Sequence, residues 1–147
     1  MKVNYQTTTS RIERLLKSSP EAINGIDFAN LSFGEYISAQ LEKNHIPKTE
    51  LASNIEIGKT YAYDIMKGTQ IPSRDVILRI TRFLKLNLEE TQRTLALAKK
   101  AALYAKDKRD ATIMTCIIKD MSLSETEAFL IITKEKSLFN NGTDEKP

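Results

Sequence analysis

Apolar residues recur along this chain mostly at spacings of three and four, and the sequence contains no convincing alternation of apolar and polar residues. A period near 3.6 is typical of helices that bury one face. With five glycines and four prolines as breakers, the sequence predicts an all-α fold. The predicted helices cover about residues 10–18, 32–44, 47–55, 58–67, 73–84, 87–97, 109–119 and 123–136.

Residues that start and stop helices punctuate the stretch from 32 to 97. Pro47 suits the first turn of a helix, where its missing N–H costs nothing, and Gly68 suits a left-handed helix end. Ser73 is a predicted N-cap, and Asn87 with Glu90 forms a predicted capping box. These signals divide the stretch into five helices.

The C-terminal part repeats the middle of the chain at a fixed offset of 35 residues. The identical pairs are Arg74/Arg109, Asp75/Asp110, Leu88/Leu123, Glu90/Glu125, Thr91/Thr126, Leu95/Leu130, Lys99/Lys134 and Leu103/Leu138. Ser122 and Glu125 also repeat the capping pair. Two amphipathic helix pairs could share leucines by chance, but the uninterrupted register favours a duplicated helix pair. We expect the second copy to pack on the first.

The expected organisation is an N-terminal helical arm over 1–31, a five-helix domain over 32–106, an appended helix pair over 107–139 and a flexible tail over 140–147. With 147 residues, 41% hydrophobic and 28% charged, the chain has the composition of a globular protein. It contains no long apolar stretch, and its first ten residues do not resemble a signal peptide. We therefore expect a cytoplasmic protein.

The formal net charge of +3, from 22 basic and 19 acidic residues, is spread thinly along the chain. Non-specific DNA affinity comes mainly from neutralised phosphates, so this balance argues against a sequence-blind DNA coat. It still permits a small patch that contacts a few phosphates.

No set of residues predicts catalysis, a cofactor or a metal site. Gly58-Lys59-Thr60 resembles the end of a phosphate-binding loop, but Ser53 occupies the position of the required first glycine and a helix precedes it instead of a strand. One histidine, His45, and one cysteine, Cys116, are too few for a zinc site or a disulfide. The carboxylates are scattered among lysines, so we expect them on solvated helix faces. The sequence therefore predicts a protein that is not an enzyme.

Residues 46–72 are the stretch that indicates a function. They are predicted to form two short helices joined by a tight turn, the arrangement that places a helix in the major groove of DNA. In the second helix, spacing directs Ala62, Ile65 and Met66 to the core. The outward face then carries Lys59, Thr60, Tyr63, Asp64 and Lys67.

The chemistry of the outward face fits recognition of base pairs. Lys59 can donate to guanine, the methyl group of Thr60 can contact thymine, and Asp64 can accept from cytosine. Tyr63 shares the N-terminal part of the helix with these candidates, and that part reads base edges in such motifs. Lys48 and Lys67 are candidates for phosphate contacts.

This stretch resembles the Xre/Cro-like helix-turn-helix family of phage repressors and bacterial regulators, over about residues 35–92. The resemblance is carried by Leu51-Ala52, the turn to Gly58, Ile65, Gly68, Pro72-Ser73 and Leu86-x-Leu88-x-Glu90. Thr60-Tyr-Ala-Tyr63, Pro72-Ser-Arg-Asp75 and Lys108-Arg-Asp110 are similar to a subgroup from Gram-positive bacteria that has the same extra helices.

The resemblance implies a five-helix DNA-binding domain, commonly dimeric, whose third helix enters the major groove. By position it places DNA contacts at Lys48, Lys59, Thr60, Asp64 and Lys67. The expected function is sequence-specific binding of double-stranded DNA as a transcriptional regulator, working as a homodimer.

The alternative is a non-catalytic protein-interaction adaptor that keeps the fold and has lost DNA binding. It is favoured by Glu56 at a turn position usually held by glycine, by the negative charge of Asp64, and by the lack of basic residues in Thr69-Gln-Ile71. In either case the N-terminal arm or the helices at 109–119 and 123–136 could supply a dimer face or a partner site.

Overall fold

The computed structural model describes residues 31–139, which contain seven helices and no strand. The helices are α3 (Phe33–Lys43), α4 (Lys48–Ile55), α5 (Lys59–Lys67), α6 (Arg74–Phe83), α7 (Leu88–Leu97), α8 (Lys108–Ile118) and α9 (Leu123–Ile132). The all-α prediction is confirmed for this part of the chain. The predicted helix at 10–18 and the predicted tail at 140–147 lie outside the described residues.

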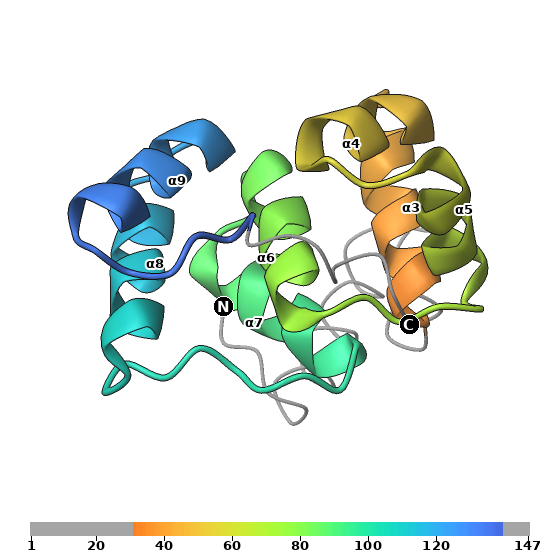
Figure 1. The fold of residues 1–147 in the computed structure, drawn as a ribbon. Helices are drawn as coiled ribbons and strands as arrows, with labels where there is room; N and C mark the ends of the chain where they lie inside the picture. The colour runs from red at the N-terminus through yellow and green to blue at the C-terminus, as the bar shows by residue number, and fades with distance from the viewer. Residues whose placement is uncertain (1–30, 140–147) are drawn as a thin grey trace.

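The helices form three neighbouring groups (Figure 1). α3, α4 and α5 lie at one side, α6 and α7 in the middle, and α8 and α9 at the other side. α6 contacts α4 on one side and α9 on the other, while α3 and α8 both contact α7. One continuous apolar core runs through all three groups.

Side-chain caps begin α6, α7 and α9 where the sequence predicts them. Ser73 accepts a hydrogen bond from the N–H of Val76, and complete capping boxes form at Asn87 with Glu90 and at Ser122 with Glu125. Two boundaries were predicted wrongly. Pro47 precedes α4 as its N-cap instead of lying in its first turn. α9 ends at Ile132, not near 136, because the chain turns at Lys134, whose φ is 63°.

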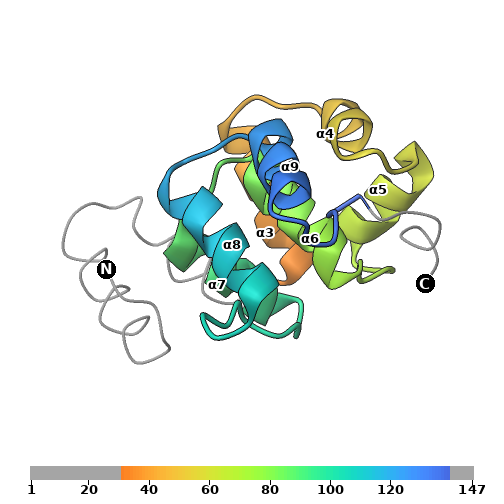
Figure 2. The same ribbon diagram turned by 60° about the vertical axis from the view of Figure 1, so that its left-hand side comes forward.

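The repeat found in the sequence is also present in the backbone. Both copies consist of two helices, and left-handed residues recur 35 positions apart, Lys85 with Asp120 and Lys99 with Lys134. Leu95 and its counterpart Leu130 are both fully buried. The chain therefore contains the same helix pair twice, as α6–α7 and α8–α9, and Figure 2 shows the second pair from another side.

The two copies are joined by an exchange of ion pairs. The guanidinium of Arg74 donates to both carboxylate oxygens of Asp110 at 3.1 and 2.8 Å, and that of Arg109 donates to both oxygens of Asp75 at 3.0 and 3.1 Å. The arginine of each copy thus binds the aspartate of the other copy. The same reciprocal pattern of contacts is found in an isologous interface between two identical subunits. The prediction that carboxylates lie on solvated faces is wrong for these two aspartates, because each is largely covered and paired.

The same arginines hold equivalent backbone turns. Arg74 donates to the carbonyls of Ala101 and Ala102, and Arg109 donates to those of Lys136 and Ser137, which are the equivalent positions of the second copy. A planar guanidinium with five donors can bind a carboxylate and two carbonyls at once, which lysine cannot do. Each arginine therefore fixes both a neighbouring helix and a turn.

Arg82 binds both copies from a single position. Its side chain is fully buried and donates to the carbonyl oxygens of Leu86 and Met121, which are equivalent residues. Burial lowers the pKa of Arg82, although an arginine remains charged at any ordinary pH. Its own counterpart in the second copy is Ile117, so only one copy supplies this contact.

The two copies differ where their surroundings differ. α6 is buried around its whole circumference from Val76 to Arg82, because it lies between α4 and α9. Ile77 and Ile80 of α6 correspond to Thr112 and Thr115 of α8, which are only partly buried. α8 thus carries partly exposed threonines at positions where α6 carries buried isoleucines.

Arg79 ties α6 to elements on both of its sides. Its guanidinium donates to the carbonyl of Ile55 at the end of α4 at 2.7 Å, and to the carbonyl of Leu138 at 2.9 Å. It also lies 4.4 Å from the ring centroid of Phe139. The end of α4 and the turn after α9 are therefore connected through one buried side chain.

α3 and α5 approach each other closely at Gly34. A Cβ atom on this glycine would lie 2.6 Å from the backbone carbonyl oxygens of both Ile65 and Met66. Only glycine allows these two backbones to pack at this separation.

We predict that Gly34→Ala destabilises the protein. Alanine normally stabilises a helix relative to glycine by about 1 kcal/mol, but here the new methyl group collides with backbone, and overpacking costs about 1–3 kcal/mol. The free energy of unfolding, measured by urea denaturation, should fall by up to about 2 kcal/mol, which is the cost of overpacking less the helix gain. Ser38→Ala, a partly exposed position of the same helix, is the control and should change it little. An increase for Gly34→Ala would contradict the close approach.

We predict that Asp110 makes stability depend on pH. Burial alone would raise the pKa of Asp110, but the hydrogen bonds from Arg74 and from the N–H of Tyr104 outweigh it and hold the pKa below its ordinary value of 3.8. The ionised carboxylate therefore contributes fully to the free energy of unfolding above pH 3.8, and this contribution is lost as pH falls through the lower pKa of the folded state. Asp110→Asn should lower the free energy of unfolding by roughly 1.5–3 kcal/mol at neutral pH, and this difference from the wild type should narrow as pH falls below 3.8.

The matched control is Asp120→Asn, which removes an ion pair with Lys85 between side chains that are 70% and 48% exposed. Such pairs contribute about 0–1 kcal/mol, so little change is expected at either pH. A gap between Asp110→Asn and wild type that stays constant from neutral to acid pH would contradict a lowered pKa.

Candidate nucleic-acid interface

A short turn of three residues joins α4 to α5. Glu56 adopts a left-handed conformation with φ 59° and ψ 52°, and the N–H of Ile57 donates to the carbonyl of Ala52 at 3.0 Å. Ile57 is buried, and Gly58 precedes α5 as its N-cap. A side chain in the left-handed region costs energy that glycine avoids, so the packing around Ile57 has to stabilise this turn.

The faces of α5 are well separated. Tyr61, Ala62, Ile65 and Met66 are buried, whereas Lys59, Thr60, Tyr63 and Lys67 are exposed and Asp64 is partly exposed. This separation is the one that the spacing of Ala62, Ile65 and Met66 predicts, and Tyr61 joins them on the buried side. The exposed face is therefore polar along its whole length, with a tyrosine in the middle.

Lys48 and Tyr63 come together although they are on different helices. The Nζ atom of Lys48, the first residue of α4, lies 5.5 Å from the ring centroid of Tyr63, and the ring remains 47% exposed. An ammonium group over a tyrosine ring is attracted by the electrons of the ring face. The contact joins the start of α4 and the exposed face of α5 into one surface.

The remaining candidates are spread along α5. Lys59 and Thr60 lie in its first turn, while Lys67 ends it, roughly 12 Å from Lys59 at 1.5 Å per residue. The Nζ atom of Lys67 is 4.0 Å from the carboxylate of Asp64, a distance and an exposure at which an ion pair contributes little. The partial positive charge of the helix N-terminus adds to that of Lys59, so an anion is best accommodated at this end of α5.

The connection from α5 to α6 carries no basic residue. α5 ends at Gly68 with φ 86°, and Thr69 donates from both its N–H and its hydroxyl to the carbonyl of Asp64. Ile71 is half exposed. Residues 68–73 can therefore offer neutral donors to a phosphate but no charge.

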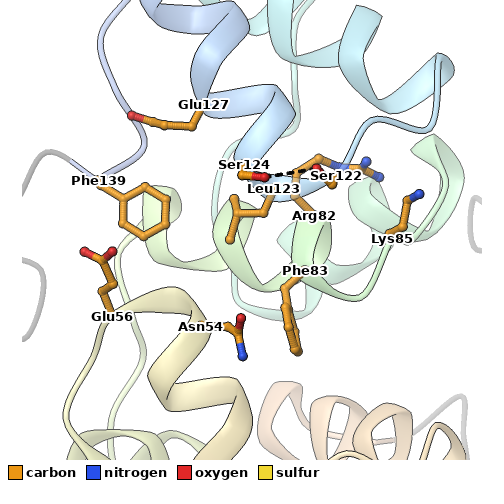
Figure 3. A pocket seen from close by; sticks show the side chains of 10 residues that line it. All are labelled: Asn54, Glu56, Arg82, Phe83, Lys85, Ser122, Leu123, Ser124, Glu127 and Phe139. Atoms are coloured by element: carbon orange, nitrogen blue, oxygen red, sulfur yellow. Dashed lines mark hydrogen bonds between the residues drawn. The ribbon is translucent and has the colours of Figure 1, made fainter.

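A pocket of ≈ 550 Å³ lies behind the α4–α5 turn (Figure 3). Asn54 and Glu56 line it from the α4 side, and its other lining residues are Arg82, Phe83, Lys85, Ser122, Leu123, Ser124, Glu127 and Phe139. Glu127 already accepts hydrogen bonds from the hydroxyl of Ser137 and the N–H of Leu138. The polar groups of Glu127 and Arg82 thus form hydrogen bonds within the fold.

Cys116 and His45, the cysteine and the histidine of this chain, lie in different environments. Cys116 is fully buried, and burial raises the pKa of its thiol, which disfavours the reactive thiolate. His45 is an exposed turn residue with φ 58°. Between residues 31 and 139, no three histidine, cysteine or acidic side chains are grouped so that they could hold a metal ion.

None of the helices described by the structure is both long enough and apolar enough to cross a membrane. Comparisons of the chain with protein-family models, with curated proteins and with solved structures find no match.

Proposed function

We propose that this protein binds double-stranded DNA in a sequence-specific manner and acts as a bacterial or phage transcriptional regulator. In this proposal α3 to α7 form a helix-turn-helix domain of the Xre/Cro-like kind, and α5 enters the major groove. The observation that carries the proposal is the exposed polar face of α5, which continues to the start of α4 through the contact of Lys48 with Tyr63.

The base-reading role goes to the first half of α5. Lys59 and Thr60 are exposed in its first turn, where a docked helix approaches base edges, and Tyr63 follows one turn later. Asp64 can only accept a hydrogen bond, so it would favour the exposed amino group of a cytosine. These side chains offer donor, acceptor and methyl contacts within two turns.

The phosphate role goes to Lys48 and Lys67, which lie at the edges of this surface. The contact with Tyr63 restricts the ammonium group of Lys48, so less side-chain freedom remains to be lost when it meets a phosphate. Lys67 is 68% exposed and only weakly engaged by Asp64. Such contacts fix the register of a protein on DNA without reading its sequence.

The proposed working form is a cytoplasmic homodimer without a cofactor or a catalytic step. A single helix-turn-helix domain buries little DNA surface, and a symmetric dimer would place two copies of α5 on half-sites one helical turn apart, roughly 34–36 Å.

A protein-interaction adaptor is the second candidate, and one observation favours it. Ile118, Ile131 and Ile132, at the ends of α8 and α9, are 71%, 62% and 73% exposed. Exposed large apolar side chains can serve as contact points for a protein partner. In this alternative the fold presents α8 and α9 to a partner and the surface of α5 has no DNA ligand.

We predict that wild-type protein selects particular fragments from the source genome and binds them with an affinity that falls as salt rises. Lys67→Ala should reduce the slope of log affinity against log salt by about one, since one phosphate contact is lost. Lys59→Ala should instead relax the preference at one base pair, at a cost of about 1–3 kcal/mol. Fluorescence anisotropy at several salt concentrations measures both effects.

Lys43→Ala provides a control, because this exposed lysine ends α3 and lies outside the proposed interface. Its salt slope and its preferred sequence should equal those of the wild type. Absence of salt-dependent binding to every genomic and random duplex would refute the regulator and leave the adaptor.

A further inference from the structure

Several lysines lie in the connection between α7 and α8 and at the first residue of α8. Residues 98–108 contain four lysines, Lys99, Lys100, Lys106 and Lys108, and one acidic residue, Asp107. Their net charge of +3 equals that of the entire chain. This segment, the basic loop, also exposes 60% of Tyr104.

Most of the charge in the basic loop is not used by the fold. Asp107 accepts a hydrogen bond from the N–H of Asp110 and so caps α8, and the Nζ atom of Lys108 lies 3.8 Å from Glu135. Lys99, Lys100 and Lys106 form no ion pair with any residue between 31 and 139. Their ammonium groups remain available for an anionic ligand.

The backbone of the basic loop is held firmly in place. Arg74 donates to two successive carbonyls of the loop, at 2.9 and 3.0 Å. The side-chain amide of Gln92 bonds both the N–H and the carbonyl of Leu103, at 2.8 and 3.0 Å, and Asp110 accepts from the N–H of Tyr104. The lysines therefore project from an ordered backbone, which lowers the entropy lost on binding.

The anchor of the basic loop is also the residue that follows the α5–α6 connection. Arg74 is the first residue of α6, and the connection from Gly68 to Ser73 immediately precedes it. The basic loop runs along the lower edge of Figure 1, and the bonds from Arg74 to the carbonyls of Ala101 and Ala102 bring the middle of the loop next to the end of the α5–α6 connection. The segment that lacks basic residues thus ends, at Ser73, next to the middle of the basic loop.

We propose that the basic loop binds the phosphates of duplex DNA next to the site of α5. Lys99, Lys100 and Lys106 neutralise phosphates, and the hydroxyl of Tyr104 can donate to a phosphate oxygen. The loop thereby supplies the charge that the α5–α6 connection lacks. This assignment rests on the proposed function, since it extends the same DNA surface to the second helix pair.

The test compares the full chain with the triple variant K99Q/K100Q/K106Q on a fragment selected by the wild type. Glutamine keeps the length and polarity of the side chains and removes three charges. The slope of log affinity against log salt should shrink by about 2–3, near one for each lost phosphate contact. The preferred sequence should stay the same, because phosphate contacts do not read bases.

The matched control is K119Q/K134Q/K136Q, which removes three charges from exposed positions of the second helix pair. Lys134 is the counterpart of Lys99, so the control also tests an equivalent turn. Its slope should equal that of the wild type. If the slope shrank equally in the two variants, the effect would come from the net charge of the protein and not from the basic loop, and the proposal would be overturned.

Other outcomes separate the proposal from the function on which it rests. Wild type that binds selectively, with an unchanged slope in K99Q/K100Q/K106Q, would overturn the role of the basic loop and leave the role of α5 intact. Wild type that binds no duplex at any salt concentration would overturn both. Loss of binding to vesicles of anionic lipid in this variant, with an unchanged slope on DNA, would assign the loop to a membrane and likewise overturn the proposal.

Discussion

The exchange of arginines and aspartates between the two helix pairs is the interaction on which the other contacts depend. Arg74 and Arg109 each bind the aspartate of the other copy and also the carbonyls of a turn in their own copy. The exchange therefore fixes the packing of α6–α7 against α8–α9 and, with it, the course of the turns after α7 and α9. Because each aspartate is largely covered, loss of one partner would leave an uncompensated charge in a poorly hydrated place.

α6 transmits this arrangement to the surface proposed for DNA. It is buried on all sides, and Arg79 connects the end of α4 to the turn after α9. The left-handed turn at Glu56 begins directly after the carbonyl that Arg79 binds. The position of α5 thus depends on contacts that reach the last described residues of the chain. This dependence gives a physical reason for α8 and α9 to accompany α3 to α7 in one core.

The sequence was sufficient for the all-α fold class, for the helix starts other than that of α4, for the repeat and for the outward face of α5, because each follows from local spacing or from capping chemistry. The repeat in the sequence shows that Arg74 is equivalent to Arg109 and that Asp75 is equivalent to Asp110. It does not show whether these residues pair within one copy or between the two copies. The contact of Lys48 with Tyr63 joins two helices and has no sequence signal. The sequence predicted the end of α9 too far along the chain. Lysine is a good helix former, so nothing in the sequence indicates that Lys134 adopts a left-handed conformation.

The reciprocity of the exchange has a consequence for how the chain is assembled. An arginine–aspartate pair that is complementary to itself is what two identical chains need to form a symmetric dimer. Here both partners are covalently linked by residues 98–107, so their association is intramolecular and does not depend on protein concentration. Once linked, the halves are also free to diverge: Arg82 faces two equivalent carbonyls while its counterpart is Ile117, an asymmetry that identical subunits could not adopt.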